Sequence, residues 1–100
     1  MKIRLKFLGS LRYDINQHYL SFQISSGNSV RDIVSELIKD SQFKELKSFF
    51  TESLDSKRSL LIFINEQEIS VLDGMKTKVN AEDTISFIPV IHGGYIFNQA

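Results

Sequence analysis

The sequence lacks cysteine and offers few other side chains from which a catalyst could be built. With no cysteine in its 100 residues, the chain has no disulfide framework, thiolate metal site or cysteine nucleophile. Its 2 histidines, His18 and His92, are far apart in the sequence and form no His-x-x-x-His pair. We therefore expect no metal site and no catalytic triad, and we predict that the protein is not itself an enzyme.

Net charge and long apolar runs are missing as well. The 12 Lys and Arg residues balance 12 Asp and Glu residues, so bulk charge does not favour a nucleic-acid or membrane partner. No apolar run approaches the roughly 20 residues of a membrane helix, and no signal-peptide core follows Met1. With 42% hydrophobic and 24% charged residues, the composition is that of a globular domain. We expect a single cytoplasmic domain.

Two segments near the N-terminus alternate between apolar and polar residues. Residues 2–7 place an apolar side chain at every second position, and residues 20–24 do the same. A period of two with one apolar face is typical of a half-buried strand. We predict a hairpin of two strands, joined by a loop over residues 9–14.

The next segment has the period of a helix. From Val30 to Ile38, apolar residues recur at intervals of three and four. Ser29 is the expected N-cap, with Asp32 in the capping-box position, and we expect the helix to end near residues 40–41. A second, weaker helical pattern over residues 43–54 predicts a short helix within a long connection.

The strand that follows the connection is apolar on both faces, which leaves its orientation open. Ile62 and Ile64 share one face, opposite Leu61 and Phe63. If Leu61 and Phe63 meet the helix, then Ile62 and Ile64 are available to a partner; otherwise the long connection covers them. The predicted partner surface comprises Ile62, Ile64, Ile88, Val90 and His92.

The C-terminal third completes the sheet. A short strand is expected around residues 68–70, and a last strand over residues 84–90 with Ile85 and Phe87 facing inwards. Pro89 cannot donate to a ladder, so regular pairing should end there on at least one side. The order of elements predicts an α+β sandwich of the β-grasp type. It has a mixed sheet of four to five strands, the last parallel to the first, with one main helix on one face and a short second helix.

Two adjacent glycines, Gly93 and Gly94, follow the last strand directly. Backbone without Cβ atoms can enter a tunnel that is too narrow for any other residue. We place the domain boundary here, with a β-grasp domain over residues 1–92. Residues 93–100 then form a tail that contains the diglycine and a six-residue extension.

Several stretches of the sequence, spread over residues 1–94, carry a family resemblance. The matching stretches are Leu11-Arg12, residues 29–34, Ile64-Asn65, residues 72–77 and residues 83–94. On these residues the chain resembles the ubiquitin-like sulfur-carrier and protein-modifier superfamily. Its members include the small subunit of molybdopterin synthase, the thiamine sulfur carrier, the ubiquitin-related modifier and the small archaeal modifier proteins.

The resemblance implies a function for the diglycine. In this superfamily an activating enzyme uses ATP to adenylate the C-terminal glycine carboxylate, which then becomes a thiocarboxylate or is passed to a lysine. By resemblance, Gly94 carries the reactive carboxyl and Gly93 lets it reach the adenylation site. The implied partners are the activating enzyme and either the large subunit of a sulfur-transfer synthase, such as molybdopterin synthase, or lysines of target proteins. No bound cofactor is implied, since the enzyme uses the ATP.

The extension after the diglycine departs from the family pattern. Family members usually end at the diglycine, whereas residues 95–100 follow it here. Gly94 in a peptide bond has no carboxylate to adenylate. Either a processing protease removes the extension, or the protein is a non-conjugating ubiquitin-like binding module that acts through its sheet face, with the tail as part of the fold.

Overall fold

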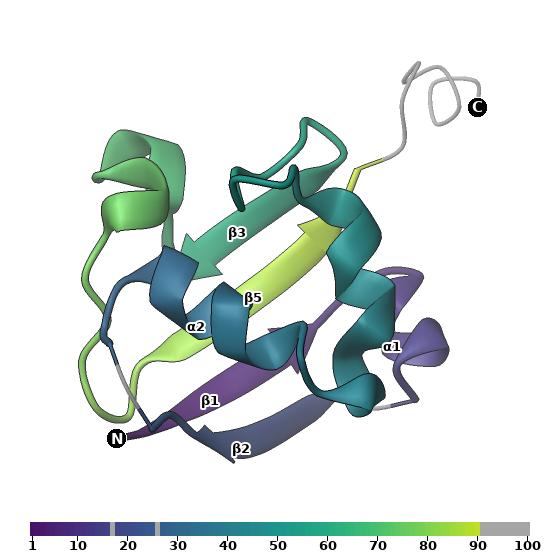
Figure 1. Cartoon of the computed structure of the whole chain (residues 1–100), viewed down its shortest axis with the longest axis horizontal. Coiled ribbons are helices and arrows are strands. Elements are labelled where there is room, and N and C mark those ends of the chain that lie inside the picture. Colours follow the sequence, from purple (N-terminus) through teal and green to yellow (C-terminus); the bar gives the residue numbers. More distant parts are fainter. Residues whose placement is uncertain (17, 26, 91–100) are drawn as a thin grey trace.

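The computed structural model describes residues 1–16, 18–25 and 27–90, which form a two-layer domain around one mixed sheet (Figure 1). The 5-stranded sheet has the order β2-β1-β5-β3-β4. Its strands are β1 (Lys2–Phe7), β2 (Tyr19–Gln23), β3 (Leu60–Ile64), β4 (Gln67–Glu68) and β5 (Thr84–Pro89). β1 and β5 are parallel, and the other pairs are antiparallel. The predicted β-grasp sheet is thereby confirmed, including its parallel first and last strands.

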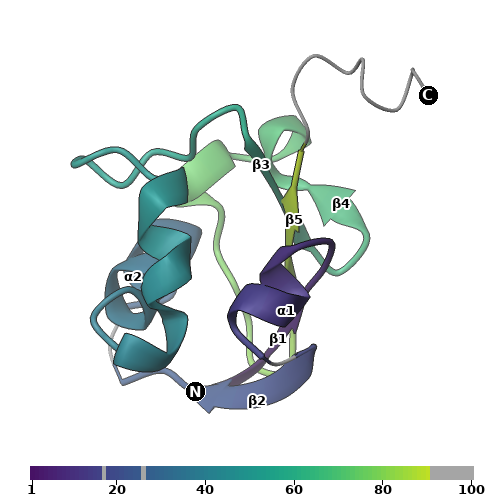
Figure 2. The ribbon, with the colours of Figure 1, turned by 90° about the vertical axis from the view of Figure 1, so that its right-hand side faces the viewer.

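Helical elements lie between the strands. They are α1 (Leu11–Asp14), α2 (Val30–Leu37) and three 3-10 segments, η1 (Ser41–Phe49), η2 (Ile69–Val71) and η3 (Gly74–Lys76). α2 and η1 both cover the same face of the sheet (Figure 2). Within the described ranges, no helix is long and apolar enough to cross a membrane.

Two local predictions were wrong. The expected loop over residues 9–14 contains α1, whose Leu11 is fully buried, with Ile15 buried one turn later. Four residues are too few to display a helical period, so the sequence pattern could not show it. The strand expected around residues 68–70 is limited to β4, because the chain turns into η2 at Ile69 and buries that side chain.

The predicted N-cap and capping box at the start of α2 are confirmed. The Ser29 hydroxyl accepts a hydrogen bond from the Asp32 N–H at 3.1 Å, and the Asp32 carboxylate accepts from the Ser29 and Asn28 N–H groups at 3.1 Å each. These bonds, from Ser29 above all, favour the charged form and lower the pKa of Asp32. The helix ends at Leu37, earlier than expected, and Asp40 then caps η1 by accepting from the Gln42 N–H at 2.9 Å.

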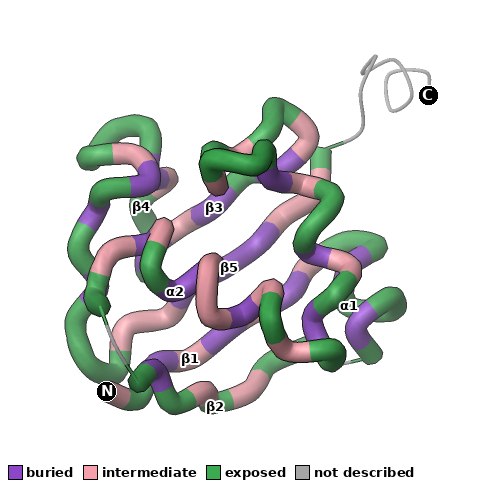
Figure 3. The backbone as a smooth tube through the Cα atoms, in the orientation of Figure 1, coloured by how far each residue is buried: buried purple, intermediate pink, exposed green. Residues whose placement is uncertain are grey.

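Aromatic side chains join the two layers. Phe7 of β1 stacks against Phe87 of β5 and Phe43 of η1, with ring centroids 5.6 and 5.7 Å apart. Phe22 of β2 meets Phe43 edge-on at 5.6 Å. Figure 3 shows the buried positions running along the strands beneath the helices. The predicted short helix is thus real, and it closes the core over β1 and β2.

Candidate functional site

The candidate site is the end of the sheet at Val90, the last described residue, and we call it the C-terminal exit because residues 91–100 of the sequence continue from it. β5 lies between β1 and β3, so the described chain ends in the middle of the sheet rather than at an edge. The Val90 N–H donates to the Ser59 carbonyl at 2.8 Å, which ties the last described residue to the start of β3. The predicted reactive residues Gly93 and Gly94, and His92 beside them, lie outside the described residues.

Pro89 marks the point where β5 loses one of its neighbours. The pairing with β1 ends at Phe87, whose carbonyl accepts from the Leu8 N–H at 3.0 Å. On the other side, pairing with β3 continues through Leu60, which lies opposite Pro89, to Val90. The missing donor of proline therefore falls on the side where β1 has already ended. The predicted one-sided end of pairing is confirmed.

Four apolar side chains gather on the sheet face opposite the helices, beside this exit. Leu61 lies directly opposite Ile88, and the exposed fractions of Leu61 and Val90 are 38% and 39%. Phe63 and Ile88 are half-buried. We call Leu61, Phe63, Ile88 and Val90 the outer-face patch. In the described part of the chain, no helix covers this face (Figure 2).

The structure corrects the predicted orientation of β3. Ile62 and Ile64 are only 1% and 7% exposed, so they belong to the core beneath α2 and cannot form a partner surface. The cause is the pairing with β5: Ile62 lies opposite the inward-facing Phe87, and Ile64 opposite Ile85. Leu61 and Phe63, which the prediction had assigned to the core as one alternative, face outwards instead.

The other predicted patch residues, Ile88 and Val90, do lie on the outer face of the sheet, so their role in partner contact stays a prediction. The signal that could have found the orientation of β3 is in β5, where inward Ile85 and Phe87 alternate with Ser86. Using it required knowing that these two strands pair and in which register.

Charged side chains of both signs border the outer-face patch, because Glu68 of β4 lies directly opposite Phe63. Lys6 lies in register with Ser86 of β5, next to Phe63. Exposed Lys57 and Arg58 directly precede Ser59, the residue that holds Val90. Such a pattern, apolar at the centre with charged side chains at the rim, is typical of a protein-binding surface.

The described residues contain no cluster of three or more His, Asp or Glu side chains that could hold a metal ion. Fold and site together define a ubiquitin-like β-grasp protein whose last strand, β5, lies in the middle of the sheet. The family model described as Urm1 (Ubiquitin related modifier) matches residues 2–94, and the chain belongs to this family. Proteins of this family are modifiers and sulfur carriers rather than enzymes, and the family implies an activating enzyme as a partner.

Relatives agree over nearly the whole chain. The chain is similar to a ubiquitin-related modifier 1 homolog of Dictyostelium discoideum, with 25% identity over 97 residues, covering 94% of this chain and all of the relative. Small archaeal modifier protein 3 of Haloferax volcanii is 24% identical over 94 residues, with 94% and 100% covered. The solved structure of small archaeal modifier protein 1 from Methanosarcina acetivorans superimposes with a TM-score of 0.76 at 27% identity, covering 93% and 96%.

Proposed function

We propose that this protein is a sulfur carrier and protein modifier that reacts through the carboxylate of Gly94 after residues 95–100 have been removed. The observation that carries the proposal is the family match, which ends at Gly94. The placement of β5 supports it, because the residues that lead to Gly94 start from the centre of the sheet beside an exposed apolar patch.

The chemistry uses main chain only. A protease hydrolyses the Gly94–Tyr95 peptide bond, and water supplies the new carboxylate oxygen. That carboxylate attacks the α-phosphorus of ATP on the activating enzyme, pyrophosphate leaves, and Gly94 becomes an acyl-adenylate. A sulfide-level donor then displaces AMP to give a thiocarboxylate, or the activated acyl group is passed on to the amine of a target lysine. Gly93 gives the segment the narrow profile that an adenylation site requires.

The outer-face patch is the surface by which we expect the activating enzyme to hold the domain. Leu61, Ile88 and Val90 are accessible beside the exit, and Lys57 and Arg58 flank them. The matched family consists of modifiers, which favours transfer to lysines and general sulfur delivery over service as the small subunit of a molybdopterin synthase.

The intact mass of the protein from its native cells tests the proposal. We expect a chain that ends at Gly94, with one oxygen replaced by sulfur in a fraction of the molecules. In parallel, chain 1–94 should support ATP–pyrophosphate exchange with the activating enzyme, whereas full-length protein and the Gly94→Pro form of chain 1–94 should not. Finding only molecules that extend through Ala100 would contradict the proposal.

That contrary result would support the second candidate, a non-conjugating binding module. The exposed outer-face patch is the observation that favours it. In that case Leu61→Asp would abolish capture of partners by the full-length protein, and cellular protein adducts would be missing.

A further inference from the structure

The two edges of the sheet differ in how they are protected. β4 consists of 2 residues and carries Glu68, so it offers little template for another strand. β2, at the opposite edge, has 5 residues and no charged side chain or proline between Tyr19 and Gln23. Figure 3 shows β2 along the border of the sheet, with its outward positions exposed. This edge lacks the usual devices that prevent strand addition.

The backbone of β2 presents a free row of hydrogen-bonding groups. Bonds to β1 are made by alternate residues: the Ile24 N–H donates to the Met1 carbonyl at 2.8 Å, and the His18 carbonyl accepts from the Phe7 N–H at 2.9 Å. Alternation in an antiparallel pair then turns the N–H and C=O groups of Tyr19, Ser21 and Gln23 away from β1. All three residues are exposed.

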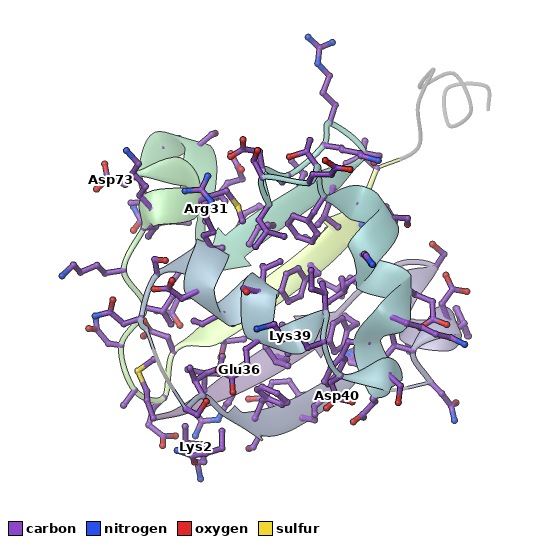
Figure 4. All side chains as sticks on the ribbon, viewed as in Figure 1. Lys2, Arg31, Glu36, Lys39, Asp40 and Asp73 are labelled. Carbon is purple, nitrogen blue, oxygen red and sulfur yellow. The ribbon has the colours of Figure 1, made fainter. Side chains whose placement is uncertain are left out.

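Side chains on the two faces of this edge have different character. On the inner face, Leu20 and Phe22 are half-buried, so an added strand would complete their burial with apolar side chains. Beyond the C-terminal end of β2 lies a hollow of about 380 Å³, whose lining includes Ser25, Glu36 and Lys39; the last two are labelled in Figure 4.

The outer face is basic. Lys2 lies in register with Gln23, and Lys6 with Tyr19. A strand added to β2 would lie about 10 Å from β1. The long stems of these lysines can bring their ammonium groups closer to the outward side chains of such a strand. Acidic side chains are therefore favoured at the outward positions of a strand that is added to β2.

We propose that the β2 edge binds an extended segment of a partner protein in which apolar and acidic residues alternate. The segment forms backbone hydrogen bonds with Tyr19, Ser21 and Gln23, packs its apolar side chains on Leu20 and Phe22, and points its carboxylates towards β1. This surface lies on the far side of β1 from the outer-face patch and the C-terminal exit, and it shares only Lys6 with the surroundings of that patch.

Charge argues against a second copy as the occupant. In a two-fold pairing centred on Ser21, Tyr19 of one copy would face Gln23 of the other. Lys6 of the first copy and Lys2 of the second would then lie in one row across the joined sheet, one on each side of the two β2 strands, so the pairing would offer no opposite charge to either lysine. An acidic segment converts the same lysines into an attractive contact.

Titration of the full-length, ¹⁵N-labelled protein with a blocked peptide of alternating valine and glutamate tests the proposal by nuclear magnetic resonance. We expect shift changes and slowed amide exchange concentrated at Tyr19, Ser21 and Gln23. A peptide of alternating valine and lysine should bind more weakly. Ser21→Pro removes one outward donor without touching the β1 ladder, and it should weaken binding by about fivefold or more.

A second variant keeps the test independent of any damage to the strand. Lys2→Glu/Lys6→Glu leaves the backbone intact and should reverse the preference between the two peptides, while the matched control Lys44→Glu/Lys76→Glu, at two exposed lysines in other elements, should not. The proposal is overturned if the native protein binds neither peptide, or if binding survives Ser21→Pro and the lysine reversal unchanged. Concentration-dependent dimerisation that Ser21→Pro abolishes would also overturn it, by assigning the edge to a second copy.

Discussion

Leu61 and Ile62 are neighbours in sequence that face opposite environments, and this gives a matched pair of substitutions. Leu61→Asp changes a patch residue that is 38% exposed, so we expect a loss of stability of about 1 kcal/mol, which leaves the domain folded. It should reduce kcat/KM for adenylation of chain 1–94 by about tenfold, as loss of an interface anchor does. Ile62→Asp buries a charge and should unfold the domain.

ATP–pyrophosphate exchange and thermal unfolding measure the two effects. Val71→Asp is the control for the effect of a new carboxylate at an exposed apolar position, since Val71 is 71% exposed and lies away from the exit. Full adenylation activity in Leu61→Asp would remove the outer-face patch from the activation step.

Asp32, at the start of α2, makes the stability of the fold depend on pH. Its pKa is lowered in the folded protein by hydrogen bonds from Ser29 and Asn28, so its carboxylate stabilises the fold above the ordinary value of 3.8. That contribution is lost as pH falls through the lowered pKa. We expect Asp32→Asn to be less stable than the native protein near neutral pH, with the difference shrinking on acidification. Denaturant unfolding at a series of pH values measures it, and a difference independent of pH would contradict it.

These residues also show where sequence reasoning succeeds and fails. Ser29 and Asp32 could be assigned in advance because a capping box is a local pattern within four residues. The orientation of Ile62 could not, because β3 is apolar on both faces and its register depends on β5, more than 20 positions further along. The outer-face patch was therefore only half predicted, through Ile88 and Val90.

At the scale of elements, η1 is attached to the sheet mainly through the side chain of Phe43. Phe43 is fully buried and contacts Phe7 and Phe22, so Phe43→Ala should lower the free energy of unfolding by about 3–5 kcal/mol. Phe49→Ala, in the same element but half-buried, should cost clearly less. Chemical denaturation measures the free energy of unfolding of both variants. Equal losses would mean that η1 is not fixed to the sheet through Phe43.

The helical pattern of this segment was visible in the sequence, but its form was not. Phe43 and Leu46 are fully buried, as the spacing suggested, whereas the element ends at Phe49. Leu54 instead lies in a turn with a positive φ of 64°. Burial fixed which residues face inwards. The form of the segment could not be predicted from its spacing, because Phe43 adopts non-helical backbone angles within it (φ −113°, ψ 25°).

At the scale of the whole molecule, the core that the structure describes is built from residues that precede the diglycine. The buried apolar residues run from Ile3 to Phe87, and the last described backbone bond is at Val90. We therefore expect chain 1–94 to match the full-length protein in stability, within about 0.5 kcal/mol. Calorimetric unfolding of the two forms checks this. A clear loss of stability in chain 1–94 would favour the binding-module alternative, in which the extension belongs to the fold.

The hydrogen bond between Val90 and Ser59 sets a tether length for any enzyme that handles this protein. Four residues separate that anchor from the far end of Gly94, and a fully extended chain of this length reaches no more than about 14 Å. If the nucleotide of the enzyme lies near this depth below the enzyme surface, Gly94 can reach it only when the folded domain itself contacts that surface. At a greater depth Gly94 cannot reach the nucleotide unless the domain enters the site. Binding of the folded domain and access to Gly94 are therefore coupled by the length of the chain between them.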